Sequence, residues 1–315
     1  MLKKSLFAGV VMALGLTAGA AIAEYPEKSI TIVVPSKAGG STDRTARMFT
    51  ELAEKNYDGF EFVIKNVPGS GGQKGFEDIA RAAPDGYTIG LVFTPQLVAH
   101  IVSGRAKYTL DSFHIMGNTA QDPAIVVVPK DSAITDMASL AEAAKANSLT
   151  VAVNGIGSDD FLAAKAFEAA TGVEFNLLPT KGSTEQKAAI LGGHVDAAFM
   201  NLSQMIKQHN AGDARIIALL TEERDEHLPD MPTAKEQGIT VLMRATRGFV
   251  APAGIDAAVQ DQLDKMLTEV MASDEFIANA KTGSIFLLPM SGADYLSYLQ
   301  SLQAETQAVY DKAPW

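Results

Sequence analysis

The stretch ITIVVPSKAGGSTDRTARMFTEL, residues 30–52, sets the fold class. It begins with a short apolar run, 30–34, without the polar alternation of a half-exposed strand, which indicates a strand covered on both faces. A Gly-Gly turn at 39–40 follows, and the next residues form one helical face with Thr45, Met48, Phe49 and Leu52. A strand, a glycine turn and a helix in this order predict one unit of an α/β fold.

The same pattern repeats along the chain. Further short runs of apolar and β-branched residues stand at 62–64, 87–93, 124–128, 149–153, 195–199 and 216–220. Helical spacing separates them, and one of these helices is expected to stop at Gly172. After 251–254 two helical stretches follow, with one short strand-like run at 285–288 between them. We therefore predict an α/β protein.

Composition limits the possible partners and chemistry. The 315 residues carry 26 Lys and Arg against 37 Asp and Glu, a net charge of -11 that repels nucleic acid phosphates. The absence of cysteine excludes disulfides, thiolate metal sites and a cysteine nucleophile. Neither a G-x-S-x-G nor an H-E-x-x-H motif is present. We expect no nucleic acid partner, no metal, no cofactor and no enzymatic activity.

The N-terminus has the layout of a secretory signal peptide. Lys3 and Lys4 precede an apolar segment at 6–16, and Ala21-Ile22-Ala23 favours cleavage after residue 23. A short buried helix or a membrane anchor is the alternative, but the apolar segment is short for a membrane span. We predict a signal peptide over 1–23 and a periplasmic mature protein.

Three turns from a strand into a helix are candidate anion sites. They lie at 35–43, 153–158 and 178–186. The expected helix caps are Ser41 or Thr42 in the first turn, Ser158 in the second, and Ser183 with Gln186 in the third. Unpaired amide N–H groups at a helix start, together with the helix dipole, favour a bound anion. Each turn also fits an ordinary strand-to-helix connection.

Two of these turns carry a lysine, although the net charge of the protein is negative. Lys37 and Lys181 are candidates to offset the desolvation of a bound anion, with solvated loop residues as the alternative. Neither turn carries an arginine, so backbone amides and lysine charges are expected to hold the ligand.

Short motifs follow one another in a characteristic order along the mature chain. They stand at 25–30, 34–43, 46–47, 66–72, 83–88, 181–182, 191–196, 231–238, 247–248 and 251–254. Each motif is common by itself, but their order and spacing together resemble the solute receptors of tripartite tricarboxylate transporters, the Bug family of periplasmic binding proteins.

This resemblance implies an α/β, two-domain periplasmic binding protein of type II-like architecture, in which each domain is a mixed sheet flanked by helices. Domain 1 would comprise 24–123 and 253–315, and domain 2 would comprise 124–252. A carboxylate would lie in the interdomain cleft, held by backbone amides and ordered waters. The implied ligand-binding residues are Lys37, Ala38, Gly39, Gly40, Ser41, Thr42, Asp43, Gly155, Gly157, Ser158, Thr180, Lys181, Gly182, Ser183, Thr184 and Asp196. Within this set, Asp43 is expected to act mainly at the helix start and Asp196 as a contact beside the pocket.

Departures from the family pattern bear on the ligand. Ser36 and Lys37 stand where the family usually has an aromatic residue and then a small residue or proline. Thr180 replaces a common tyrosine, Glu185 a common proline, and Val67 a frequent arginine. The pocket is then less aromatic and more cationic, which favours a polar aliphatic di- or tricarboxylate over an aromatic acid.

The expected function is that of a monomeric receptor that captures a small organic acid and delivers it to the membrane subunits of a tripartite tricarboxylate transporter. A carboxylate-sensing partner of a membrane signalling protein and a secreted hydrolase on the same scaffold are the alternatives. The only tryptophan, Trp315, is expected to lie far from the ligand.

Overall fold

The computed structural model describes residues 25–283, 285–312 and 314–315. The predicted signal peptide, 1–23, lies outside these residues. None of the helices in the described ranges is both long enough and apolar enough to cross a bilayer.

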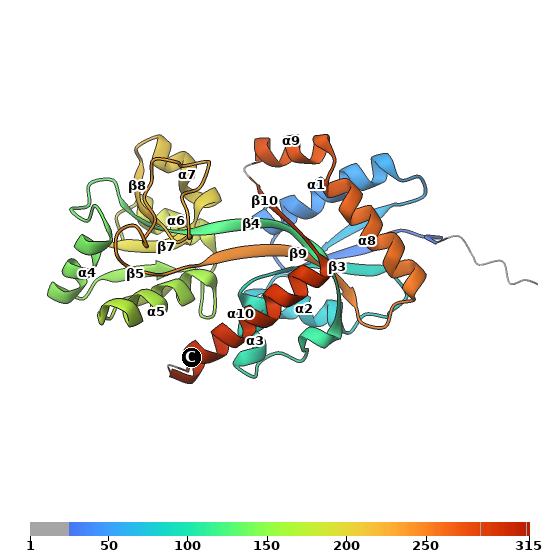
Figure 1. Cartoon of the computed structure of the whole chain (residues 1–315), viewed down its shortest axis with the longest axis horizontal. Helices are drawn as coiled ribbons and strands as arrows, with labels where there is room; N and C mark the ends of the chain where they lie inside the picture. Colours follow the sequence, from blue (N-terminus) through green and yellow to red (C-terminus); the bar gives the residue numbers. More distant parts are fainter. Residues whose placement is uncertain (1–24, 284, 313) are drawn as a thin grey trace, which may run out of the picture.

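Two lobes are built on one path of paired strands (Figure 1). The strand order is β2-β1-β3-β9-β4-β7-β5-β6, and β8 and β10 also pair with β4. The strands are β1 (Ile30–Val34), β2 (Phe62–Asn66), β3 (Thr88–Phe93), β4 (Phe113–Pro129), β5 (Thr150–Val153), β6 (Asn176–Pro179), β7 (Ala197–Asn201), β8 (Ala214–Leu219), β9 (Arg244–Pro252) and β10 (Phe286–Ser291).

Strands β4 and β9 connect the lobes. The first part of β4, 113–123, pairs antiparallel with β9, and its last part, 124–129, pairs with β7 and β8 of the second lobe. In Figure 1 both strands run from one lobe into the other. The predicted boundaries, 123/124 and 252/253, therefore fall within β4 and at the end of β9, and the assignment of residues to domains stays a prediction.

Helices cover both faces of each sheet. They are α1 (Ser41–Asn56), α2 (Gln73–Ala80), α3 (Gln96–Val102), α4 (Met137–Ala146), α5 (Asp159–Thr171), α6 (Ser183–Leu191), α7 (Leu202–Asn210), α8 (Ala257–Met271), α9 (Asp274–Gly283) and α10 (Gly292–Lys312). In the first lobe, α1, α8 and α9 bury their apolar faces on one side of the sheet, and α2, α3 and α10 on the other. In the second lobe, α4 and α5 lie opposite α6 and α7. The predicted α/β class with helix-flanked mixed sheets is confirmed.

Local sequence rules account for these elements. Strand β1 is almost fully buried, as its apolar run predicts, because helices pack on both of its faces. Helix α5 ends at Gly172, which adopts a left-handed φ of 73°, so the predicted helix stop is confirmed.

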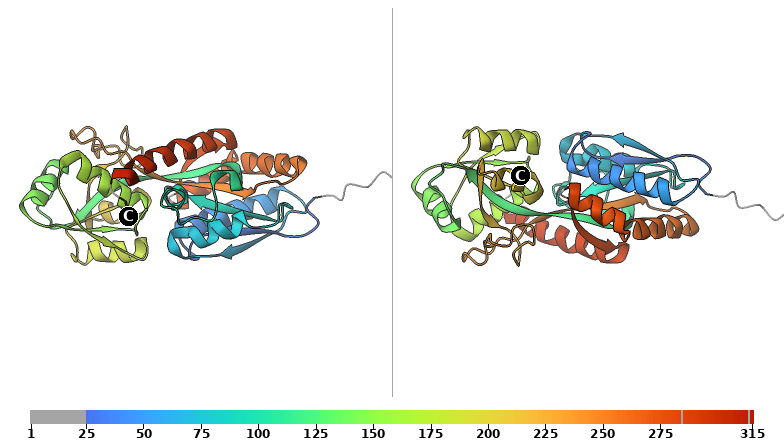
Figure 2. Two further views of the ribbon diagram at one scale, coloured as in Figure 1. Left: turned by 90° about the horizontal axis from the view of Figure 1, so that it is seen from below. Right: turned by 90° about the horizontal axis from the view of Figure 1, so that it is seen from above.

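Helix α10 carries the C-terminal segment from the first lobe to the second (Figure 2). The indole of Trp315 packs edge-on against Phe161 of α5, with ring centroids 5.7 Å apart, and against Tyr310 at 4.8 Å. A methyl group on Gly157 would lie 3.5 Å from Trp315 Nε1. Trp315 is therefore beside one of the candidate anion turns, and the expectation that it lies far from them was wrong, because α10 crosses between the lobes.

Candidate functional site

The sheet brings two of the three candidate turns together. Strands β5 and β6 are parallel neighbours, so the turns at 153–158 and 178–186 leave the same edge of the second sheet. A methyl group on Gly155 would lie 3.9 Å from the carbonyl oxygen of Thr180. The third turn, between β1 and α1, belongs to the first lobe.

Two of the three helices at these turns start without a side-chain cap. The N-cap of α1 is Gly40 and that of α6 is Gly182, so the predicted caps Ser41 or Thr42 and Ser183 were wrong. Only α5 is capped as predicted, because Ser158 Oγ accepts from the amide of Phe161 at 3.1 Å. The first amides of α1 and α6 therefore lack an internal acceptor, which is the condition for anion binding at a helix start.

Gln186 does not form the predicted capping box. Its side chain is fully buried, and Nε2 donates to the carbonyl oxygens of Ala152, at 3.1 Å, and Phe199. Gln186 thereby ties α6 to β5 and β7. These two hydrogen bonds satisfy two buried carbonyl oxygens. They stabilise the protein more than a cap would at a helix end that solvent can reach.

Asp43 organises the first turn from within. Its buried carboxylate accepts from the amide of Gly39 at 2.8 Å, from Arg47 Nε at 2.9 Å and from Asn66 Nδ2 at 2.9 Å. Burial opposes ionisation, but these hydrogen bonds hold the pKa of Asp43 below its usual value. Asp43 thus acts at the helix start, and its oxygens are already occupied. Thr180 is likewise occupied, since its hydroxyl donates to the carbonyl of Val153 at the end of β5 and to that of Gly182 in its own turn.

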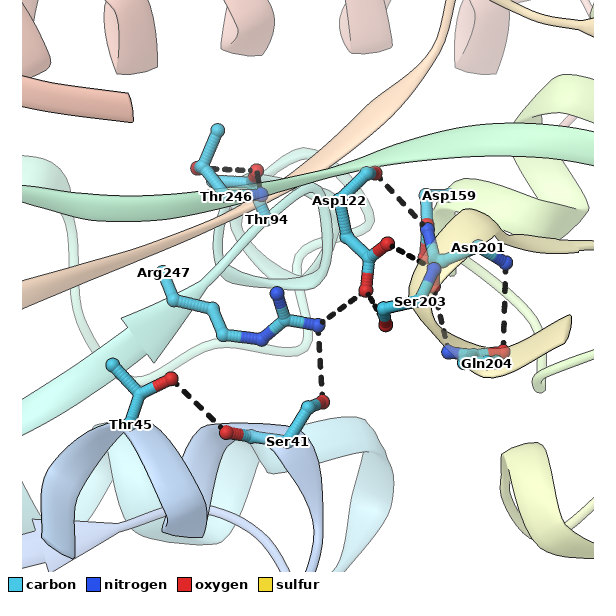
Figure 3. Close-up of polar contacts among 10 residues, drawn as sticks. All are labelled: Ser41, Thr45, Thr94, Asp122, Asp159, Asn201, Ser203, Gln204, Thr246 and Arg247. Carbon is cyan, nitrogen blue, oxygen red and sulfur yellow. Dashed lines mark hydrogen bonds and ion pairs between the residues drawn. The ribbon is translucent and has the colours of Figure 1, made fainter. Parts of the chain in front are cut away.

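Arg247 links the first turn to β4, one of the strands that connect the lobes (Figure 3). It is the only Lys or Arg among the described residues whose side chain is buried. From β9, its Nη2 donates to Ser41 Oγ at 3.0 Å in the first turn and to Asp122 Oδ2 at 3.2 Å on β4. Asp122 also accepts from the amide of Ser203, at 3.0 Å, and from its hydroxyl. The sequence-based statement that neither turn carries an arginine is right, yet an arginine from a distant strand reaches the first turn.

The network continues to the start of α5. Asn201 Nδ2 donates to Asp159 Oδ2 at 2.6 Å and to the carbonyl oxygen of Asp122 at 3.3 Å. Burial raises the pKa of Asp159 to about 6; the Asn201 hydrogen bond opposes this shift, and the charge of Asp122 adds to it. Burial and the charge of Asp159 also raise the pKa of Asp160, whose Oδ1 is buried without a partner. Asp159 and Asp160 therefore keep their protons to a higher pH than ordinary aspartates do.

Positive charge from both lobes lies near the two uncapped helix starts. Burial lowers the pKa of Lys187 on α6, and the nearby charges of Lys207 on α7 and Arg44 on α1 lower it further. Arg44 lies in the first turn of α1, so a cation of the first lobe contributes to the lowered pKa of a lysine in the second lobe. The lysines singled out from the sequence, Lys37 and Lys181, are both exposed.

Most of the remaining predicted residues lie in the turns, but Asp196 does not. Ala38 and Gly39 are exposed in the first turn, and Gly157 lies against Ala99 of α3 at the lobe boundary. Asp196 is placed elsewhere, because its Oδ2 accepts from the amide of Thr150 at the beginning of β5. The turns leave the other end of that strand, roughly 10 Å away. Asp196 is therefore not part of the candidate site.

A hollow on the protein surface does not coincide with the predicted ligand-binding residues. A hollow on the outer face of the first lobe is lined by Arg47, Thr50, Glu51, Glu54, Phe62 and Ile64. It contains none of the predicted ligand-binding residues, whereas the polar network around Arg247 reaches the first turn at Ser41 and the start of α5 at Asp159. We take the network as the candidate site.

The comparisons with known proteins decide the family. The model of the tripartite tricarboxylate transporter family receptor matches residues 46–313. This chain belongs to that family. It is 28% identical to the protein BugT of Bordetella pertussis over 265 residues, 82% of this chain and 81% of BugT. The resemblance found in the sequence is thereby confirmed.

Solved receptors share the fold. The periplasmic binding protein BugD is 27% identical, with a TM-score of 0.80 over 92% of this chain and 98% of BugD. R. palustris Rpa4515, solved with adipate, is 25% identical, with a TM-score of 0.81 over 91% of this chain and 98% of that protein. The family and these neighbours are solute-binding receptors, not enzymes, in agreement with the prediction that the protein is not an enzyme.

Sequence reasoning missed several residues of this receptor's polar centre. They are Asp122, Asp159, Asn201, Ser203 and Arg247. Two signals were available. Arg247 directly precedes the apolar end of the run that became β9, and two aspartates follow the expected cap of α5 directly. Buried charges without a local partner call for a distant one.

Proposed function

We propose that this protein is a periplasmic receptor that binds a small polar aliphatic carboxylate between its lobes and delivers it to the membrane subunits of a tripartite tricarboxylate transporter. The observation that carries the proposal is the pair of uncapped helix starts, α1 in one lobe and α6 in the other, with Arg247 contacting the first. Backbone N–H groups and a buried guanidinium are suited to a carboxylate.

A di- or tricarboxylate fits better than an aromatic acid. Arg44 on α1 and Lys187 on α6 add positive charge to the two helices that start without a cap, and burial together with the charges of Lys207 and Arg44 lowers the pKa of Lys187. The hydroxyls of Ser41 and Ser203 add polar contacts. The structural neighbour Rpa4515 was solved with adipate, an aliphatic dicarboxylate of this kind. The lysines at 37 and 181 are exposed and contribute less than the sequence suggested.

The test is a thermal-shift screen of residues 24–315, refolded without ligand, against aliphatic mono-, di- and tricarboxylates, aromatic acids, amino acids and sugars. A ligand at 100 times its dissociation constant stabilises the folded state by about 2.7 kcal/mol, a rise in Tm of several degrees. Silence across all carboxylates would refute the proposal.

Delivery to a transporter needs a test in cells. Deletion of the gene should abolish uptake of the identified acid while leaving induction of acid-responsive genes intact. The opposite pattern, normal uptake with lost induction, would assign the protein to sensing.

A further inference from the structure

Arg247 holds more hydrogen-bond donors than its partners use. A guanidinium carries five N–H groups. Both hydrogen bonds of Arg247 to described residues leave from Nη2, to Ser41 and to Asp122. Nε and Nη1 donate to no described residue, and neither is among the buried atoms that lack a partner. Three N–H groups of a largely buried cation are therefore accessible to a small molecule.

Further unused donors surround this open side of the guanidinium. The Ser41 hydroxyl accepts from Arg247, so its own hydrogen is available to another acceptor. Ser41 and Thr42 are also the first residues of α1, whose N-cap Gly40 has no side chain to bond their amides. Nε and Nη1 of Arg247, the Ser41 hydroxyl and the first amides of α1 therefore lie around one place, and none of these donors has an acceptor among the described residues.

Asp122 fixes the orientation of the guanidinium. Its carboxylate is 1% exposed and is itself held by the amide and the hydroxyl of Ser203 in the second lobe. The ion pair compensates the buried charge of Arg247 without occupying its remaining donors. Asp122 is thus anchored from the lobe opposite Ser41, and Arg247 spans the space between the two.

Resting on the proposed function, we infer that Arg247 is the residue that engages one carboxylate of the ligand, through Nη1 or Nε together with the Ser41 hydroxyl, and that Asp122 is its positioning residue. The ligand then touches the first lobe, β9 and, through Asp122 and Ser203, a network of the second lobe. Its binding strengthens a contact that both lobes share, which couples capture to the relative position of the lobes.

The experiment uses isothermal titration calorimetry with the acid identified in the screen and with its monoamide of equal length. Arg247→Lys keeps the charge beside Asp122 but removes the planar guanidinium. We expect the Kd for the acid to rise at least about tenfold, the loss of one charge-assisted contact. The preference for the acid over the monoamide should fall by the same factor, which a purely structural role of Arg247 would not cause.

A second variant keeps the test interpretable if Arg247→Lys does not fold. Arg247→Met combined with Asp122→Asn removes the ion pair without leaving one charge buried alone, and it should fold while losing about a hundredfold or more in affinity. Arg244→Lys, an exposed position on the same strand bonded to Gln121, is the matched control and should bind like the wild type.

The outcomes separate the two proposals. If the wild type binds a carboxylate and the folded double variant binds it equally well, the role of Arg247 is refuted and the receptor function stands. If the wild type binds no carboxylate after ligand-free refolding, the proposed function fails and takes the role of Arg247 with it.

Discussion

Replacing Asp159 by asparagine should make the protein more stable at alkaline pH. Burial raises the pKa of Asp159 from 3.8 to about 6. An acid whose folded-state pKa is raised binds its proton more tightly when folded, so stability falls as pH rises from about 4 to about 6. The difference corresponds to about 3 kcal/mol at pH 8. Asp159→Asn removes this penalty while its amide oxygen still accepts from Asn201.

The assay is urea unfolding, followed by circular dichroism between pH 4 and pH 8, of the wild type, Asp159→Asn and the exposed control Asp58→Asn. The free energy of unfolding of Asp159→Asn should exceed that of the wild type at pH 8 by as much as about 3 kcal/mol, and the two should converge near pH 4. Parallel pH profiles, or a variant less stable than the wild type at pH 8, would refute the reasoning that Asp159 is ionised at a cost.

Two further predictions concern the ligand. Gly40→Asp places a carboxylate at the uncapped start of α1, where φ is -71° and the added Cβ would lie 3.3 Å from the carbonyl oxygen of Lys37. It should change stability by only a few tenths of a kcal/mol and weaken ligand binding about tenfold, and unchanged affinity in calorimetry would contradict the anion site. Trp315, packed on Phe161 beside Gly157, should change its fluorescence saturably with the calorimetric Kd, and the change should vanish in Trp315→Phe; constant emission at saturation would show that this contact does not respond to the ligand.

Much of this protein could be predicted from sequence because the controlling interactions are local. The apolar run of β1 indicated burial on both faces, and Gly172 marked the end of α5, since side-chain burial and left-handed backbone conformation depend on a few neighbouring residues. The family resemblance could be found for the same reason, because it rests on short motifs and on their order along the chain.

The sequence predicted where α1 and α6 begin to within one residue, but it did not predict which residue caps each helix. Serine is a favoured N-cap, so Ser41 and Ser183 were assigned this role, but the caps are Gly40 and Gly182. The backbone of each turn enters its helix one residue earlier than the preference suggests. This single-residue difference leaves the first amides of both helices without a side-chain acceptor, which is the condition for an anion site at each helix start.

The sequence alone determined the fold class, the family and the turns proposed to carry the site, because these follow from local preferences and their order. Only the tertiary structure decided which charges meet there. Arg247 and Ser41 lie 206 positions apart, and the direction of β5 places Asp196 at the strand end away from the turns. Contacts of this kind depend on strand order and on the path of β4 and β9 between the lobes, and no local pattern encodes the distance between residues that only the completed sheet brings together.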